Sequence, residues 1–147
     1  MATVAANDMT VLATYLRSMQ LYYHHVHHHL KGPSFFADHP HAADSYAAVE
    51  GQFDSVVERI IGTHGCDTLD LNDMLARVAK YLKGAPDVEA APIDFWRHAL
   101  KMEQALQKMT EALCKGADEA DKQLISTIGD TSKSRSYQLK RRIGEEK

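Results

Sequence analysis

The sequence predicts an all-α fold: an up-and-down bundle of four long helices with a short extra helix in one connection. In four long segments, apolar residues recur every three or four positions, the pattern of a single buried stripe on an α-helix. Glycine and proline, eight and four among 147 residues, fall mostly between these segments. No segment alternates apolar and polar residues over a useful length, so we expect no sheet.

The first two predicted helices are separated by Gly32 and Pro33. The first runs from about residue 9 to residue 31, and its apolar stripe is Leu12, Leu16, Met19, Tyr23, Val26 and Leu30. The second runs from about residue 39 to residue 61, with Pro40 near its first turn, where a missing N–H costs little. Its stripe is Tyr46, Val49, Phe53, Val56 and Ile60.

The third predicted helix opens at Pro92 and Asp94 and closes at Gly116. Its stripe is Trp96, Ala99, Met102, Leu106, Met109 and Leu113. The fourth carries a weaker stripe around a polar middle at 132–136: Ala120, Leu124, Ile128, Leu139 and Ile143. Gly129 lowers its helix propensity, but we still expect a helix there.

About 30 residues connect the second and third helices, too many for a tight bundle loop. Within them a short amphipathic helix is predicted by the spacing of Leu71, Met74, Leu75, Val78 and Leu82. A four-helix bundle with such a crossover between its second and third helices is the ferritin-like variant. We expect one ferritin-like domain over 1–147, with residues 1–8 as a flexible tail.

Composition excludes several classes of protein. Hydrophobic residues make up 44% and charged residues 25%, and no apolar run approaches the ~20 residues of a membrane span. The formal net charge of −3 gives no overall argument for nucleic-acid binding. The start of the chain lacks a secretory signal, so we expect a cytoplasmic location. Cys66 and Cys114 have no CxxC spacing, so we expect free thiols. No phosphate-binding loop, nucleophile elbow or HExxH motif is present.

Histidine is the distinctive residue: five of the nine lie between positions 24 and 29. Consecutive helical residues point around the whole circumference, so these five cannot all serve one site, and most are expected to be solvated. His39 follows His27 by twelve positions across the Gly32–Pro33 turn, so these two imidazoles can come together. Glu50, Asp54 and Glu58 form a carboxylate ladder along the second helix, a pattern that a solvated acidic face also produces.

Helix geometry separates the histidines from the carboxylates within one chain. At ~1.5 Å per residue, Asp54 lies roughly 22 Å along the helix from His39. A combined metal site would need two chains packed antiparallel about a twofold axis. A site inside the bundle would need Glu-x-x-His motifs, and the sequence has none. Imidazole with carboxylate at an interface would suit iron or zinc.

The stretch from His27 to Gly62 resembles the signature of the Dps family of miniferritins. In that signature a histidine precedes a Lys/Arg-Gly turn, a second histidine follows twelve positions on, and an Asp-x-x-x-Glu-Arg sequence ends the motif. The resemblance implies a homododecameric shell that oxidises Fe(II), typically with hydrogen peroxide, and stores the ferric mineral. It also implies that His27 and His39 of one subunit and Asp54 and Glu58 of its twofold mate are the ligands.

The chain departs from the family pattern at two positions. Ala43 stands where the family usually has a further aspartate, and Asp44 or His41 could compensate. His28 stands where the family commonly has a tryptophan, so the stacking and radical-trapping roles of that tryptophan are not carried over.

Charged residues at both ends of the fourth helix suggest two further roles. Asp118, Glu119 and Asp121 complement the positive helix end, and the resemblance adds an acidic iron-entry pore at a threefold axis. Five basic residues lie near the other end: Lys133, Arg135, Lys140, Arg141 and Arg142. No basic residue precedes Arg17, so the N-terminal segment offers no positive charge that could bind DNA phosphates. We therefore expect weak DNA binding or none at physiological salt.

These observations together predict an iron-sequestering ferroxidase that protects against oxidative damage. One alternative is a non-catalytic dodecameric shell or a DNA-compacting structural protein. Another is a histidine-rich helical protein that binds zinc or nickel.

Overall fold

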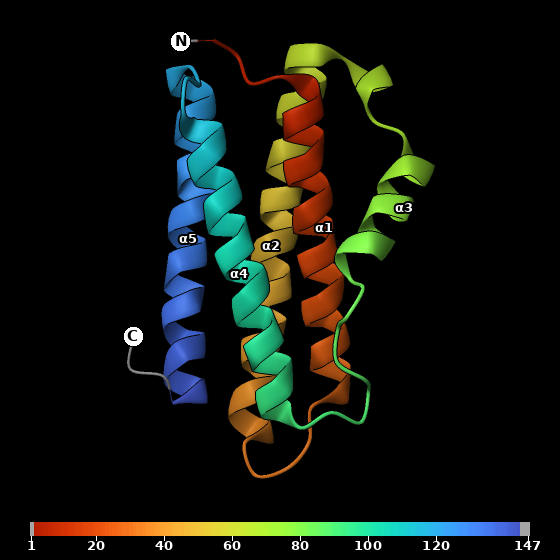
Figure 1. The fold of residues 1–147 in the computed structure, drawn as a ribbon, viewed down its shortest axis with the longest axis vertical. Helices are drawn as coiled ribbons and strands as arrows, with labels where there is room; N and C mark the ends of the chain where they lie inside the picture. Colours follow the sequence, from red (N-terminus) through yellow and green to blue (C-terminus); the bar gives the residue numbers. More distant parts are fainter. Residues whose placement is uncertain (1, 145–147) are drawn as a thin grey trace.

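The computed structural model describes residues 2–144 and shows the expected four-helix bundle (Figure 1). The long helices are α1 (Ala6–His29), α2 (Phe35–His64), α4 (Pro92–Cys114) and α5 (Glu119–Ile143). The closest packing is of α1 against α2 and of α4 against α5. The all-α prediction is confirmed: within residues 2–144, the only β-type pairing is an isolated bridge between Ala2 and Ala117.

The predicted crossover is confirmed as well. A short 3₁₀ turn (Cys66–Thr68) and α3 (Leu71–Tyr81) lie between α2 and α4. This connection runs from one end of the bundle to the other, with α3 beside α1, so that α2 and α4 run in the same direction (Figure 1). Asp70 caps α3 by accepting the amide of Asp73 at 2.7 Å.

The start of α2 differs from the prediction. The helix begins at Phe35, four residues earlier than expected, and Pro40 therefore lies inside its second turn. Proline lacks an N–H, so the carbonyl of Phe36 loses its usual helical partner. The side chain of Phe36 is 90% exposed, so this end of the helix faces solvent, where water can replace that bond.

Residues 2–5 are paired with the turn before α5. The amide of Ala2 donates to the carbonyl of Gly116 at 3.0 Å, and the amide of Asp118 donates to the carbonyl of Ala2 at 2.8 Å. The amide of Val4 donates to the carboxylate of Asp121 at 2.9 Å. We predicted a flexible tail over residues 1–8 from the sequence, whereas α1 already begins at Ala6. The partners of this segment lie more than 110 positions away, so local sequence patterns do not reveal them.

A buried charged network joins three helices in the core. Arg135 of α5 binds both carboxylate oxygens of Glu103 of α4, at 2.6 and 3.0 Å. The same carboxylate accepts the hydroxyls of Tyr23 of α1, at 2.5 Å, and of Ser132, at 2.8 Å. Glu103 is fully buried, so this network satisfies a charge that would otherwise be costly inside the bundle.

Gly129 has a packing role in α5. A Cβ atom at this position would lie 2.7 Å from the hydroxyl oxygen of Thr110 in α4. The glycine therefore allows the two helices to approach closely, which offsets its poor helix propensity.

Among residues 2–144, no helix is both long and apolar enough to cross a membrane.

Candidate metal centre

His27 and His39 form a stacked imidazole pair where α1 ends and α2 begins. Their ring centroids lie 3.7 Å apart, with 25° between the ring planes. Nδ1 of His27 donates its proton to the backbone carbonyl of His39 at 3.0 Å. The lone pair of His27 is therefore on Nε2, the arrangement common among metal-binding histidines. Both side chains are half-buried.

Aromatic neighbours hold this pair in place. Phe35 stacks on His39 with ring centroids 4.7 Å apart. Tyr46 meets the ring of His27 edge-on at 5.5 Å, and His24 packs against Tyr46 at 4.4 Å. Because Phe35 and Tyr46 lie on α2, that helix fixes the orientation of both imidazoles.

Asp54 and Glu58 lie further along α2, and both are exposed. Fifteen residues of helix separate Asp54 from His39, roughly 22 Å, so one chain does not bring the carboxylates to the imidazoles. Within residues 2–144, no group of three or more histidine, cysteine, aspartate or glutamate side chains could hold a metal ion. A single chain therefore carries two separated parts of the predicted site.

His41 and Asp44 lie on another face of α2. Residues two and five positions beyond His39 are turned about 160° and 140° away from it around the helix. Both line a hollow between α2 and α5, together with Arg135 and Gln138. The ring of His41 meets Trp96 edge-on at 5.5 Å, and burial lowers the pKa of His41. Ala43 shares the face of His39 on α2, and His41 and Asp44 do not.

Two of the three acidic residues at the start of α5 have structural partners. Asp118 caps the helix by accepting the amide of Asp121 at 2.9 Å, and this bond is the main cause of the lowered pKa of Asp118. Asp121 is buried and accepts from Arg59 at 2.9 Å and from the amide of Val4 at 2.9 Å. Glu119 is exposed. The pore prediction therefore depends mainly on Glu119.

Two of the five basic residues in the second half of α5 are also engaged inside the chain. Arg135 is buried against Glu103, and Arg142 binds both oxygens of Asp38 at 2.9 Å. Neither pair was predicted from the sequence, although Arg135 follows Ile128 by seven positions and precedes Leu139 by four, in register with the apolar stripe. A charged residue at a position of the buried apolar stripe indicates that it is paired with a buried partner of opposite charge.

Comparisons with known proteins identify the family and the fold. Residues 12–135 match the family model of the ferritin-like domain. No curated protein sequence matches the chain.

Several solved structures share the fold. One is Dps from Microbacterium arborescens in the high iron form, with a TM-score of 0.84, 17% identity, and coverage of 97% of this chain and 93% of that chain. Dps from Listeria monocytogenes has a TM-score of 0.82 and 16% identity, covering 97% and 96%. Dps from Listeria innocua soaked with cobalt has a TM-score of 0.82 and 16% identity, covering 97% and 94%.

Proposed function

Because this chain belongs to the ferritin-like family, we propose that it is an iron-storing miniferritin that oxidises Fe(II) at sites shared between two copies. Twelve copies would form a closed shell that keeps the ferric product inside and so protects the cell against oxidative damage. Hydrogen peroxide is the proposed oxidant: it takes one electron from each of two Fe(II) ions and, with two protons, becomes two waters.

The observation that carries the proposal is the incomplete imidazole pair. His27 and His39 are held by stacking and by the bond from Nδ1 of His27 to the carbonyl of His39. A histidine whose other nitrogen is fixed in this way is oriented toward a ligand and is more basic at Nε2. Since no third metal ligand accompanies the pair within residues 2–144, a second copy is the natural source of the missing ligands.

Asp54 and Glu58 are the candidate ligands from that second copy. They are one turn apart on α2 and both are exposed, so their carboxylates can reach across an interface. Iron accepts both carboxylate oxygen and imidazole nitrogen. The negative charge of the carboxylates favours Fe(III) over Fe(II), which lowers the cost of giving up an electron. Zinc has similar ligand preferences and would compete for the same site.

Among residues 2–144, the bundle interior holds no cluster of side chains that could bind iron. The fully buried carboxylate of Glu103 is neutralised by two hydrogen bonds from Arg135 and accepts further hydrogen bonds from Tyr23 and Ser132. A carboxylate that is paired in this way has no lone pair free for a cation. The chemistry is therefore expected at the interface between chains.

One structural feature favours a non-catalytic shell as the second candidate. Ala43 lies one turn beyond His39 on the same face of α2 and supplies no ligand atom. His41 and Asp44 face the hollow beside α5 instead. A site with one carboxylate fewer could retain the assembly and lose the oxidation.

Oxidation of Fe(II), followed by ferric absorbance, separates the two candidates. The parental protein should oxidise Fe(II) added with peroxide, and added zinc should inhibit it. The double variant Asp54→Asn/Glu58→Gln keeps the side-chain shapes while removing both charges, so it should oxidise slowly with the shell intact by light scattering. A parental shell that leaves Fe(II) unoxidised would favour the non-catalytic candidate. Monomers at micromolar concentration would contradict both.

A further inference from the structure

A second pair of histidines lies on the opposite flank of α1 from His27. The ring centroids of His25 and His29 are 4.3 Å apart, with 38° between the ring planes. Nδ1 of His29 donates its proton to the backbone carbonyl of His25 at 2.8 Å. Both side chains are half-buried.

The rings of this pair are close enough for both imidazoles to reach one ion. Two imidazoles that bind one ion at adjacent positions, with metal–nitrogen distances of about 2.1 Å, have ring centres roughly 4.5 to 5 Å apart, depending on the angle at the ion. The observed separation of 4.3 Å is close to this range. Because Nδ1 of His29 carries a proton, its Nε2 has the lone pair that a metal needs. Histidines four positions apart on one helix face are an established metal-binding arrangement.

We propose that His25 and His29 bind a divalent transition-metal ion of the borderline class, namely Zn²⁺, Ni²⁺, Co²⁺ or Cu²⁺. Imidazole nitrogen suits these ions, whereas Mg²⁺, Ca²⁺ and Mn²⁺ prefer oxygen. The residues described supply two ligands only, so water completes the coordination and the ion exchanges readily.

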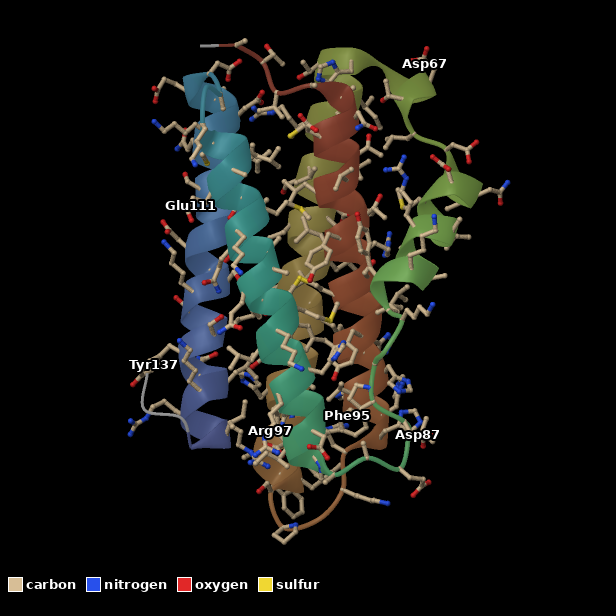
Figure 2. The ribbon with its side chains drawn as sticks, in the orientation of Figure 1. Asp67, Asp87, Phe95, Arg97, Glu111 and Tyr137 are labelled. Carbon is tan, nitrogen blue, oxygen red and sulfur yellow. The ribbon has the colours of Figure 1, made fainter. Side chains whose placement is uncertain are left out.

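This site is separate from the proposed oxidation site. His25 and His27 are two residues apart and point about 160° away from each other around the helix. His27 faces α2, whereas His25 lies 6.4 Å edge-on from Phe95 of α4, a side chain at the α1 side of α4 (Figure 2). Metal binding by His25 and His29 therefore does not depend on the proposed function.

The neighbouring pair of His24 and His28 provides a matched comparison. Its ring centroids are 4.5 Å apart with 39° between the planes, so its spacing is similar. Among residues 2–144, however, no hydrogen bond fixes the proton position in either ring, and His24 is packed against Tyr46. The fixed tautomer of His29 is what distinguishes the proposed chelate.

Calorimetric titration with Ni²⁺ tests the inference on the full chain. The background is the Asp54→Asn/Glu58→Gln variant, which weakens competition from the shared site. This protein should bind about one Ni²⁺ per chain at the new site, and adding His29→Gln or His25→Gln should lower that affinity at least about tenfold. Adding His28→Gln, the matched control, should leave it unchanged. Equal binding with and without His29→Gln, or equal loss with His28→Gln, would overturn the assignment.

Anomalous diffraction from crystals soaked in Ni²⁺ gives a second, direct readout. The ion should lie about 2.1 Å from Nε2 of His29 and from a ring nitrogen of His25. Density only at His27 and His39, or only at His24 and His28, would contradict the proposal. Fe(II) oxidation by His29→Gln in the parental background should proceed at the parental rate, which separates this site from the proposed function.

Discussion

The guanidinium of Arg142 binds both carboxylate oxygens of Asp38, with each nitrogen–oxygen distance at 2.9 Å. Asp38 is buried and directly precedes His39. Hydrogen bonding to Asp38 raises the pKa of Arg142. The last turn of α5 thereby fixes the first turns of α2, and with them the backbone that presents His39.

Replacing Arg142 by methionine should destabilise the protein. Asp38 would stay buried without its partner, at a cost of about 1–3 kcal/mol. The matched control is Arg141→Met, because Arg141 is exposed and its loss should cost within about 0.5 kcal/mol. Thermal unfolding at one fixed protein concentration should show a lower midpoint for the Arg142 variant only. Equal midpoints for the two variants would mean that the pair adds no stability.

The Glu103–Arg135 pair should show a strong coupling in a double-mutant cycle. Glu103→Gln leaves a buried guanidinium without its counter-charge, at a cost of about 3–5 kcal/mol. Arg135→Met should cost a similar amount, since it leaves the carboxylate unpaired. The combination Glu103→Gln/Arg135→Met removes both charges and should be less destabilising than the sum of the single changes. Strictly additive losses in denaturant unfolding would argue against coupling between the two residues.

DNA retention should be weak or absent near physiological salt. Of the five basic residues in the second half of α5, Arg135 and Arg142 are already paired with Glu103 and Asp38. The remaining three offer few phosphate contacts per chain, and such contacts weaken steeply as salt rises. A gel-shift titration at ~0.15 M salt, where screening extends only about 8 Å, checks this. Tight binding there, lost when the chain ends after Gln138, would favour the DNA-compacting alternative.

Helix periodicity was sufficient to predict most of the fold. Stripes such as Leu12 to Leu30 depend only on which residues are apolar, so four long helices and the α3 segment follow from local spacing. The start of α2 could not be predicted in this way. Proline is most common in the first turn of a helix, so Pro40 indicated a start near residue 39. Here the contacts of Asp38 with Arg142 and of Phe35 with His39 hold the helix in place ahead of the proline.

The candidate site was predictable in part. The twelve-residue spacing across a tight turn brings His27 and His39 together, and the structure places them in contact. The positions of His41 and Asp44 depend on how α2 is rotated against α5, and the roles of Asp118 and Asp121 depend on where residues 2–5 lie. These are tertiary relationships between distant segments, so no local pattern encodes them.

Whether one copy supplies the imidazoles and another the carboxylates can be tested by complementation between two variants. The variants His27→Gln/His39→Gln and Asp54→Asn/Glu58→Gln should each form shells that oxidise Fe(II) slowly. When both are co-expressed and assemble together, a mixed pair of copies has one site with all its native ligands and one with none. Random pairing then restores about a quarter of the sites. Mixed shells should therefore recover about a quarter of the parental rate. Mixed shells no faster than the two pure variants would show that the ligands do not come from two copies.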